Sequence, residues 1–109
     1  MALTEATNSG TSNSTTAVEL ITSPGTGERH ISKTISIYNA DTVAAAATVY
    51  YYDGSNSRTI LKVTLSAGDQ LVIDDVLVID DENASIRLVL DDAVTTNQLP
   101  FTAHYGVAS

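Results

Sequence analysis

Carboxylates are the most numerous groups in this sequence that could do chemistry. Residues 67–90, AGDQLVIDDVLVIDDENASIRLVL, hold six acidic side chains and a single base, Arg87. Acidic residues in loops suit a hard cation such as Ca²⁺, which takes several oxygen ligands. However, neither DDENAS (80–85) nor YDGSNS (52–57) has the alternating ligand pattern of a calcium-binding loop. We therefore predict no specific metal site, and only loose association of cations with the acidic surface.

Histidines and nucleophiles give no catalytic pattern. His30 and His104 are far apart, and neither belongs to an HExxH or G-x-S-x-G motif. The sequence has no cysteine, which excludes disulfides, thiolate metal sites and cysteine nucleophiles. The glycine-rich PGTGER (24–29) lacks the lysine and the spacing of a phosphate-binding loop. We predict that the protein is not an enzyme and has no cofactor.

Tyrosines form the remaining candidate site, in VYYYDGSNS (49–57). In a strand, Tyr50 and Tyr52 share one face and Tyr51 takes the other. Rings beside a polar loop can stack on sugars, as in carbohydrate-binding modules, but cross-strand packing of aromatic side chains explains the same pattern. The sequence leaves both interpretations open.

Net charge narrows the choice of partners. Thirteen acids against five bases give a formal charge of −8, the wrong sign for a protein that neutralises nucleic-acid phosphates. No apolar run is long enough to span a bilayer. We therefore expect neither a nucleic-acid nor a membrane partner, and the charge favours a basic or cation-rich one. A domain of this size without disulfides or metal often gains stability by self-association.

Hydrophobic patterning predicts an all-β fold. Short apolar runs are separated by turn residues, at the spacing typical of an antiparallel β-sandwich or jelly-roll of about seven or eight strands. The runs are residues 17–22, 29–38, 44–52, 58–65, 70–74, 76–80, 84–90 and 99–107. No stretch predicts a convincing helix, although residues 40–48 fit either a strand or a short helical turn.

Alternation within these runs predicts which side chains are buried. In residues 29–38 it places Ile31, Ile35 and Ile37 on the inner face and Ser32 on the outer one. The acidic residues fall at strand ends and turns, so they separate the apolar runs without interrupting them. Charges in such places discourage edge-to-edge association of sheets.

The N-terminal segment has a different composition. Residues 4–16, TEATNSGTSNSTT, are almost all small or polar and bury too little apolar surface to offset the entropy of ordering them. This predicts a flexible arm over residues 1–16 and a single β-sandwich domain over residues 17–109. An alternative is an arm that becomes ordered only along a neighbouring subunit.

Several motifs resemble small β-sandwich structural proteins of tailed bacteriophages. The matching segments are ISIYN (35–39), TVYY (48–51), LSAGDQLVIDDVL (65–77) and ASIRLVL (84–90). In that family they correspond to a strand I-x-I-x-N, a strand T-V-x-Y and a longer motif, L-x-A-G-D/E-x-L-x-L-D-D-x-L-x-L. The resemblance covers about half to two-thirds of the chain; residues 1–16 and the last strand lie outside it.

The resemblance implies a virion component without enzymatic activity. Within that class it favours a capsid decoration (cement) protein that binds the outer shell, forms a trimer or ring, and is assembled into the virion in the bacterial cytoplasm. Its partners would be the major capsid protein or other virion proteins. A neck or tail accessory protein, or a carbohydrate-binding adhesion module, is the alternative. The candidate partner-binding residues are Thr4, Asn8 and Thr11 in the arm and Asp74, Asp75, Asp80 and Asp81 in the turns.

Overall fold

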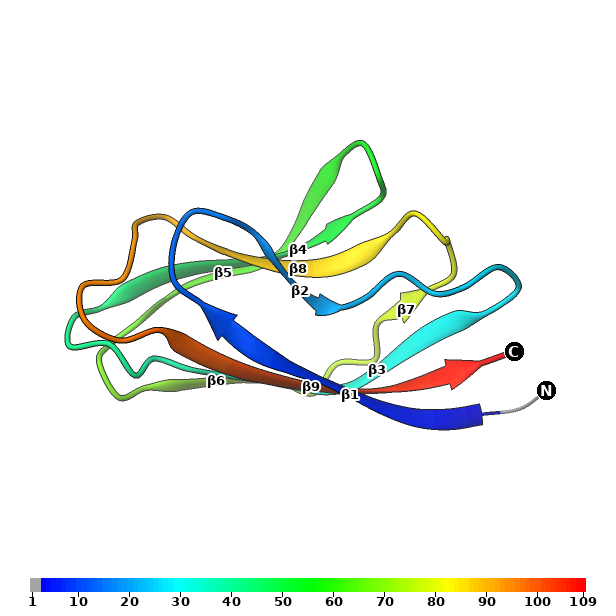
Figure 1. Cartoon of the computed structure of the whole chain (residues 1–109), viewed down its shortest axis with the longest axis horizontal. Coiled ribbons are helices and arrows are strands. Elements are labelled where there is room, and N and C mark those ends of the chain that lie inside the picture. Colours follow the sequence, from blue (N-terminus) through cyan, green and yellow to red (C-terminus); the bar gives the residue numbers. More distant parts are fainter. Residues whose placement is uncertain (1–2) are drawn as a thin grey trace.

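The computed structural model describes residues 3–109, and these form an all-β protein (Figure 1). The part of the chain so described holds no helix long and apolar enough to cross a membrane. The strands are β1 (Leu3–Ser12), β2 (Val18–Ile21), β3 (Arg29–Tyr38), β4 (Ala45–Tyr52), β5 (Ser57–Leu65), β6 (Gln70–Ile73), β7 (Val78–Ile79), β8 (Ser85–Leu90) and β9 (Leu99–Ala108).

Two antiparallel sheets make a β-sandwich, as the sequence predicts. One sheet has the order β1-β9-β3-β6, with β7 also pairing with β3, and the other has the order β2-β8-β4-β5. Figure 1 shows the two layers facing each other, with β4, β5 and β8 in one and β6, β9 and β1 in the other.

The pairing is nested along the chain. The first strand pairs with the last, β2 with β8, β3 with β6 and β7, and β4 with β5. The chain is therefore one long hairpin rolled up so that its two arms run side by side. If β6 and β7 are counted as one interrupted strand, this is the eight-strand, two-sheet arrangement of a jelly-roll.

The core lies between the sheets and follows the predicted alternation in most strands. In β8, Ile86, Leu88 and Leu90 are buried, and so are Phe101 and Ala103 of β9. The uncertain segment 40–48 is resolved as a loop followed by β4, which begins at Ala45. The β-branched and aromatic residues of β4 outweigh the helix propensity of its alanines, because they pack against both neighbouring strands, β5 and β8.

The prediction for the inner face of β3 is wrong at one end. The register with β9 shifts between Ser32 and Thr34, so this β-bulge turns the preceding residues over. Ile35 and Ile37 point inward, but Ser32 and His30 are buried there as well, and Ile31 is half-buried on the outer face. An extra residue in one strand exchanges the faces of all residues beyond it, which a strict two-residue period does not anticipate.

The flexible-arm prediction also differs from the structure. Leu3–Ser12 form β1, a ten-residue edge strand that pairs with β9 along its whole length. Its inward side chains are small, so it buries little apolar surface, but its backbone completes a hydrogen-bonded ladder that composition does not reveal. Inside, the Asn8 amide donates to the carbonyl oxygens of Glu19 (2.9 Å) and Leu20 (3.0 Å) of β2.

Candidate partner-binding surfaces

The predicted acidic residues lie along one edge of the sandwich. Asp74 and Asp75 occupy the break between β6 and β7, and Asp80 and Asp81 follow β7 directly. All four side chains are exposed. The Thr34 hydroxyl donates to Asp74 Oδ1 at 3.4 Å, and the Asp81 carboxylate accepts from the Asn83 backbone N–H at 2.9 Å. We call this stretch, residues 70–82, the acidic edge.

Three valines of the acidic edge are exposed, which sequence reasoning missed. The exposed fractions of Val72, Val76 and Val78 are 49%, 70% and 49%, so this short stretch holds half of the six exposed large hydrophobic residues found among residues 3–109. Their neighbours Ile73 and Ile79 are buried. A signal was present, since two-residue alternation in VID puts valine opposite isoleucine. Since valine and isoleucine are both apolar, the sequence does not show which of the two is exposed.

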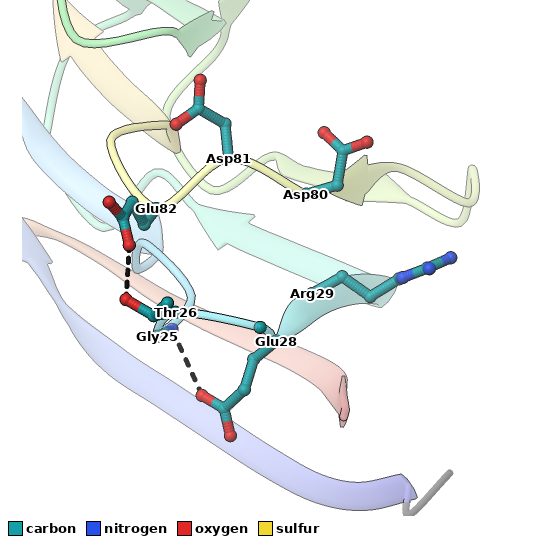
Figure 2. A pocket seen from close by; sticks show the side chains of 8 residues that line it. Gly25, Thr26, Glu28, Arg29, Asp80, Asp81 and Glu82 are labelled. Atoms are coloured by element: carbon teal, nitrogen blue, oxygen red, sulfur yellow. Dashed lines mark hydrogen bonds between the residues drawn. The ribbon is translucent and has the colours of Figure 1, made fainter.

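A hollow of about 690 Å³ continues the acidic edge beyond β7. It is lined by Gly25–Glu28 from the loop before β3, by Arg29 at the start of β3 and by Asp80–Glu82. The two loops are tied together because the Thr26 hydroxyl donates to Glu82 Oε2 at 2.5 Å. Figure 2 shows the Arg29 side chain extending away from the carboxylates of Asp81 and Glu82, so the hollow keeps an acidic wall.

Metal binding at these carboxylates receives no support from the geometry. Within residues 3–109, no three His, Cys, Asp or Glu side chains are grouped as a metal site requires.

The predicted arm residues lie at the opposite edge of the same sheet. Thr11 is exposed, and its hydroxyl donates to Gln98 Oε1 at 2.5 Å. Thr4 pairs with Val107 of β9, and the Asn8 side chain is already hydrogen-bonded to the backbone of β2. Since β9 and β3 separate β1 from β6, the structure does not bring the arm residues and the acidic edge together. They form two surfaces.

Asp41 is a buried carboxylate that sequence reasoning did not select. It accepts hydrogen bonds from the backbone N–H groups of Thr95 (2.8 Å), Thr96 (2.8 Å), Asn97 (3.1 Å) and Thr42 (2.8 Å). These donors, Thr95 first, outweigh burial and lower the pKa of Asp41 to about 2. The side chain joins the β3–β4 loop to the β8–β9 loop. Its role is structural, because every contact is internal.

The tyrosines divide as the alternation predicts. Tyr51 packs against the core, and its pKa is raised, mainly by burial and further by nearby acids such as Asp80. Tyr50 pairs with Arg87 on the outer side of its sheet, and the Arg87 guanidinium lies 4.2 Å from the centre of the Tyr52 ring. One face of that ring is therefore already stacked on a cation, which weakens the case for sugar stacking there.

The two histidines lie on adjacent strands, β3 and β9, but on opposite faces of the sheet. His30 is buried, with Nδ1 2.7 Å from the Thr22 carbonyl oxygen and its ring centre 4.8 Å from that of Tyr105. His104 is exposed on the outer face of β9, where Nδ1 lies 3.2 Å from the Thr7 hydroxyl. Each has a local structural partner, and they share no site.

Comparisons with known proteins show the fold. No protein-family model and no curated protein matches the sequence. Among solved structures, a Bacillus endospore appendage protein, described as forming disulfide-linked pili, is similar with a TM-score of 0.55 and 9% identity. The similarity covers 99% of this chain and 87% of that one.

Two viral proteins share the same architecture. The coat protein of Tobacco streak virus is similar with a TM-score of 0.55 and 10% identity, over 98% of this chain and 84% of that chain. A protein of the infectious bursal disease virus particle is similar with a TM-score of 0.52 and 12% identity, over 96% of this chain but only 30% of that one. At such identities these similarities establish the β-sandwich architecture.

Proposed function

We propose that this chain is a non-enzymatic structural protein of a virion. The observation that carries the proposal is the nested strand pairing of a jelly-roll, an architecture that is used by viral capsid proteins. The similarity to a viral coat protein extends over nearly the whole of both chains. The internal contacts of Asp41 and of the two histidines, which are structural, agree with a role that needs no chemistry.

Within that class we favour a capsid decoration protein of a tailed bacteriophage, which binds the outer shell and stabilises it. The support comes from the resemblance of residues 35–39, 48–51, 65–77 and 84–90 to such proteins. Its partner would be the major capsid protein, and its place the virion, assembled in the bacterial cytoplasm. A homo-oligomer, either a trimer or a ring, would suit the symmetry of a shell.

Co-sedimentation with capsids tests this proposal. The purified full-length protein is mixed with intact and with expanded empty capsids of the phage that encodes it, and its mass in solution is measured by light scattering. We expect near-stoichiometric co-sedimentation and a higher temperature of shell disruption. If the protein forms a ring-sized oligomer that does not bind shells, the neck or tail accessory role takes its place.

A glycan-binding measurement distinguishes the decoration role from the carbohydrate-binding adhesion module. Tyr50→Ala and Tyr52→Ala are compared with the unchanged protein for binding to host-cell polysaccharide. Binding that both substitutions abolish, without shell binding, would replace the decoration role by a carbohydrate-binding one. Under the decoration proposal, neither polysaccharide binding nor an effect of these substitutions on shell binding is expected.

A further inference from the structure

The outer side of the acidic edge has no strand partner within residues 3–109. Strand β6 ends the order β1-β9-β3-β6, and β7 pairs with β3 on its inner side. The backbone groups that point outward are therefore available for pairing with another chain. Two segments offer such pairing, Gln70–Ile73 and Val78–Ile79, with the Asp74–Leu77 break between them.

Apolar side chains are exposed at the same edge. By register, Val72 lies opposite Ser36 and Val78 opposite Ile31, so both valines stand on the outer face of the sheet. Val76, in the break, has the largest exposed fraction of the three, 70%. A strand edge protected only against aggregation would be expected to carry polar residues here. Exposed apolar side chains next to free backbone groups are the combination that strand addition uses.

Charge defines the chemistry of what would bind. Six carboxylates lie between residues 69 and 82, and this stretch contains no lysine or arginine. Both ion pairs of the described residues lie elsewhere, between Lys33 and Glu5 and between Lys62 and Asp91. None of these carboxylates is therefore held in an ion pair with a basic side chain of residues 3–109, and Arg29 is the one basic residue that lines the hollow beside Asp80 and Asp81. A second copy would bring like charges together, and nucleic acid or an anionic membrane would be repelled.

We propose that the acidic edge docks a basic, extended segment of another protein. The segment adds to β6 and β7 through backbone hydrogen bonds, its apolar side chains contact Val72, Val76 and Val78, and its lysines or arginines pair with the carboxylates. One basic side chain enters the hollow beside Asp80 and Asp81. This inference rests on the proposed function and deepens it, because it names the surface and the chemistry through which the protein would hold a shell protein.

A peptide-binding experiment tests the proposal on the full-length protein. The probe is a fluorescent synthetic peptide, Lys-Val-Lys-Thr-Lys-Val-Lys with blocked ends, and the affinity is measured by anisotropy at low and physiological ionic strength. The control peptide has glutamate in place of each lysine. We expect the lysine peptide to bind, with an affinity that falls as salt rises, and the glutamate peptide not to bind.

Matched variants locate the site. We expect the paired substitutions Asp74→Asn and Asp75→Asn, and separately Val72→Thr and Val78→Thr, each to weaken peptide binding by roughly tenfold. The control for the first pair is Asp91→Asn with Asp92→Asn, another adjacent acidic pair. The control for the second is Val43→Thr, a valine of similar exposure (46%) in the β3–β4 loop. Circular dichroism verifies that all variants keep the fold.

Three results would overturn the inference. If the control pair Asp91 and Asp92 loses as much peptide affinity as the pair Asp74 and Asp75, the peptide is attracted by net charge alone. If the affinity is unchanged in the valine variant, the peptide does not contact the acidic edge. A change in oligomeric mass in place of peptide affinity would mean that the edge binds a second copy.

Shell sedimentation of the same variants separates this inference from the proposed function. Shells that bind the Asp74→Asn, Asp75→Asn variant as well as the unchanged protein would overturn the docking surface and leave the function standing. Shells that bind neither protein, together with edge-dependent peptide binding, would overturn the function and retain the docking surface for another basic partner.

Discussion

The Asp41 carboxylate and the backbone N–H of Thr95 are joined by a hydrogen bond of 2.8 Å across 54 positions of sequence. The same carboxylate accepts from Thr96 and Asn97, so one side chain fixes the second half of the loop that leads into β9. Asn39 supports it from the other side, since its Oδ1 accepts from the Asp41 N–H at 3.0 Å and its Nδ2 donates to the Val43 and Leu65 carbonyls. These contacts hold one end of the sandwich together.

Asp41→Asn is expected to lower the midpoint of thermal unfolding. The amide keeps the shape of the side chain, but it replaces one acceptor oxygen by an NH₂ group facing backbone donors, and it removes the charge that strengthens each bond. The control is Asp92→Asn, an exposed acid at the β8–β9 loop that should change the midpoint little. Equal effects of the two substitutions in calorimetry would contradict this role for Asp41.

The stabilisation by Asp41 is expected to disappear in acid. Its pKa is about 2 in the folded protein against 3.8 for the ordinary side chain, so the folded state favours the ionised form. The contribution is therefore complete above about pH 5 and is lost as pH falls toward 2. The difference in unfolding midpoint between the protein and Asp41→Asn should be constant from neutral pH to about pH 5 and then shrink. A difference that persists at pH 2 would argue against this explanation.

The two faces of β7 should respond very differently to truncation. Ile79 is fully buried, so Ile79→Ala is expected to cost about 2–5 kcal/mol of unfolding free energy through lost contacts and a cavity. The adjacent Val78 is 49% exposed, and Val78→Ala should stay within about 0.5 kcal/mol. Urea unfolding of the two variants measures both values. A large loss of unfolding free energy in Val78→Ala would mean that the valines of the acidic edge stabilise the fold and are not free to contact a partner.

Much of the fold was predictable because most strands bury one face cleanly. The alternation in β8 and β9 identifies Ile86, Leu88 and Phe101 as core residues directly from the sequence. The bulge at Ser32–Thr34 was not predictable, because an extra residue leaves no compositional mark. Strand β1 was missed for another reason, since its order comes from backbone pairing with a strand about 90 residues away in the chain.

The candidate surfaces were predictable only in part. Charge counting identified the acids of the acidic edge, since loop carboxylates are visible in sequence. The exposure of Val72 and Val78 was not assigned, because the alternating valine and isoleucine are both apolar and the sequence does not show which of them lies on the outer face. The contacts of Asp41 depend on a loop that arrives from the far end of the chain, and a single aspartate in NADT gives no sign of its partners.

Strand β1 is expected to open independently of the remainder of the sandwich. Its inward residues are small, and a side chain at Gly10 would place its Cβ 3.0 Å from Phe101 Cζ. Gly10→Leu should therefore displace β1 from β9, whereas Ser9→Leu, which projects to the outer face, should not. Since β1 buries little apolar surface, its amides should lose protection from hydrogen exchange while those of β4 and β8 keep theirs. Loss of protection throughout the molecule would instead make β1 part of the cooperative core.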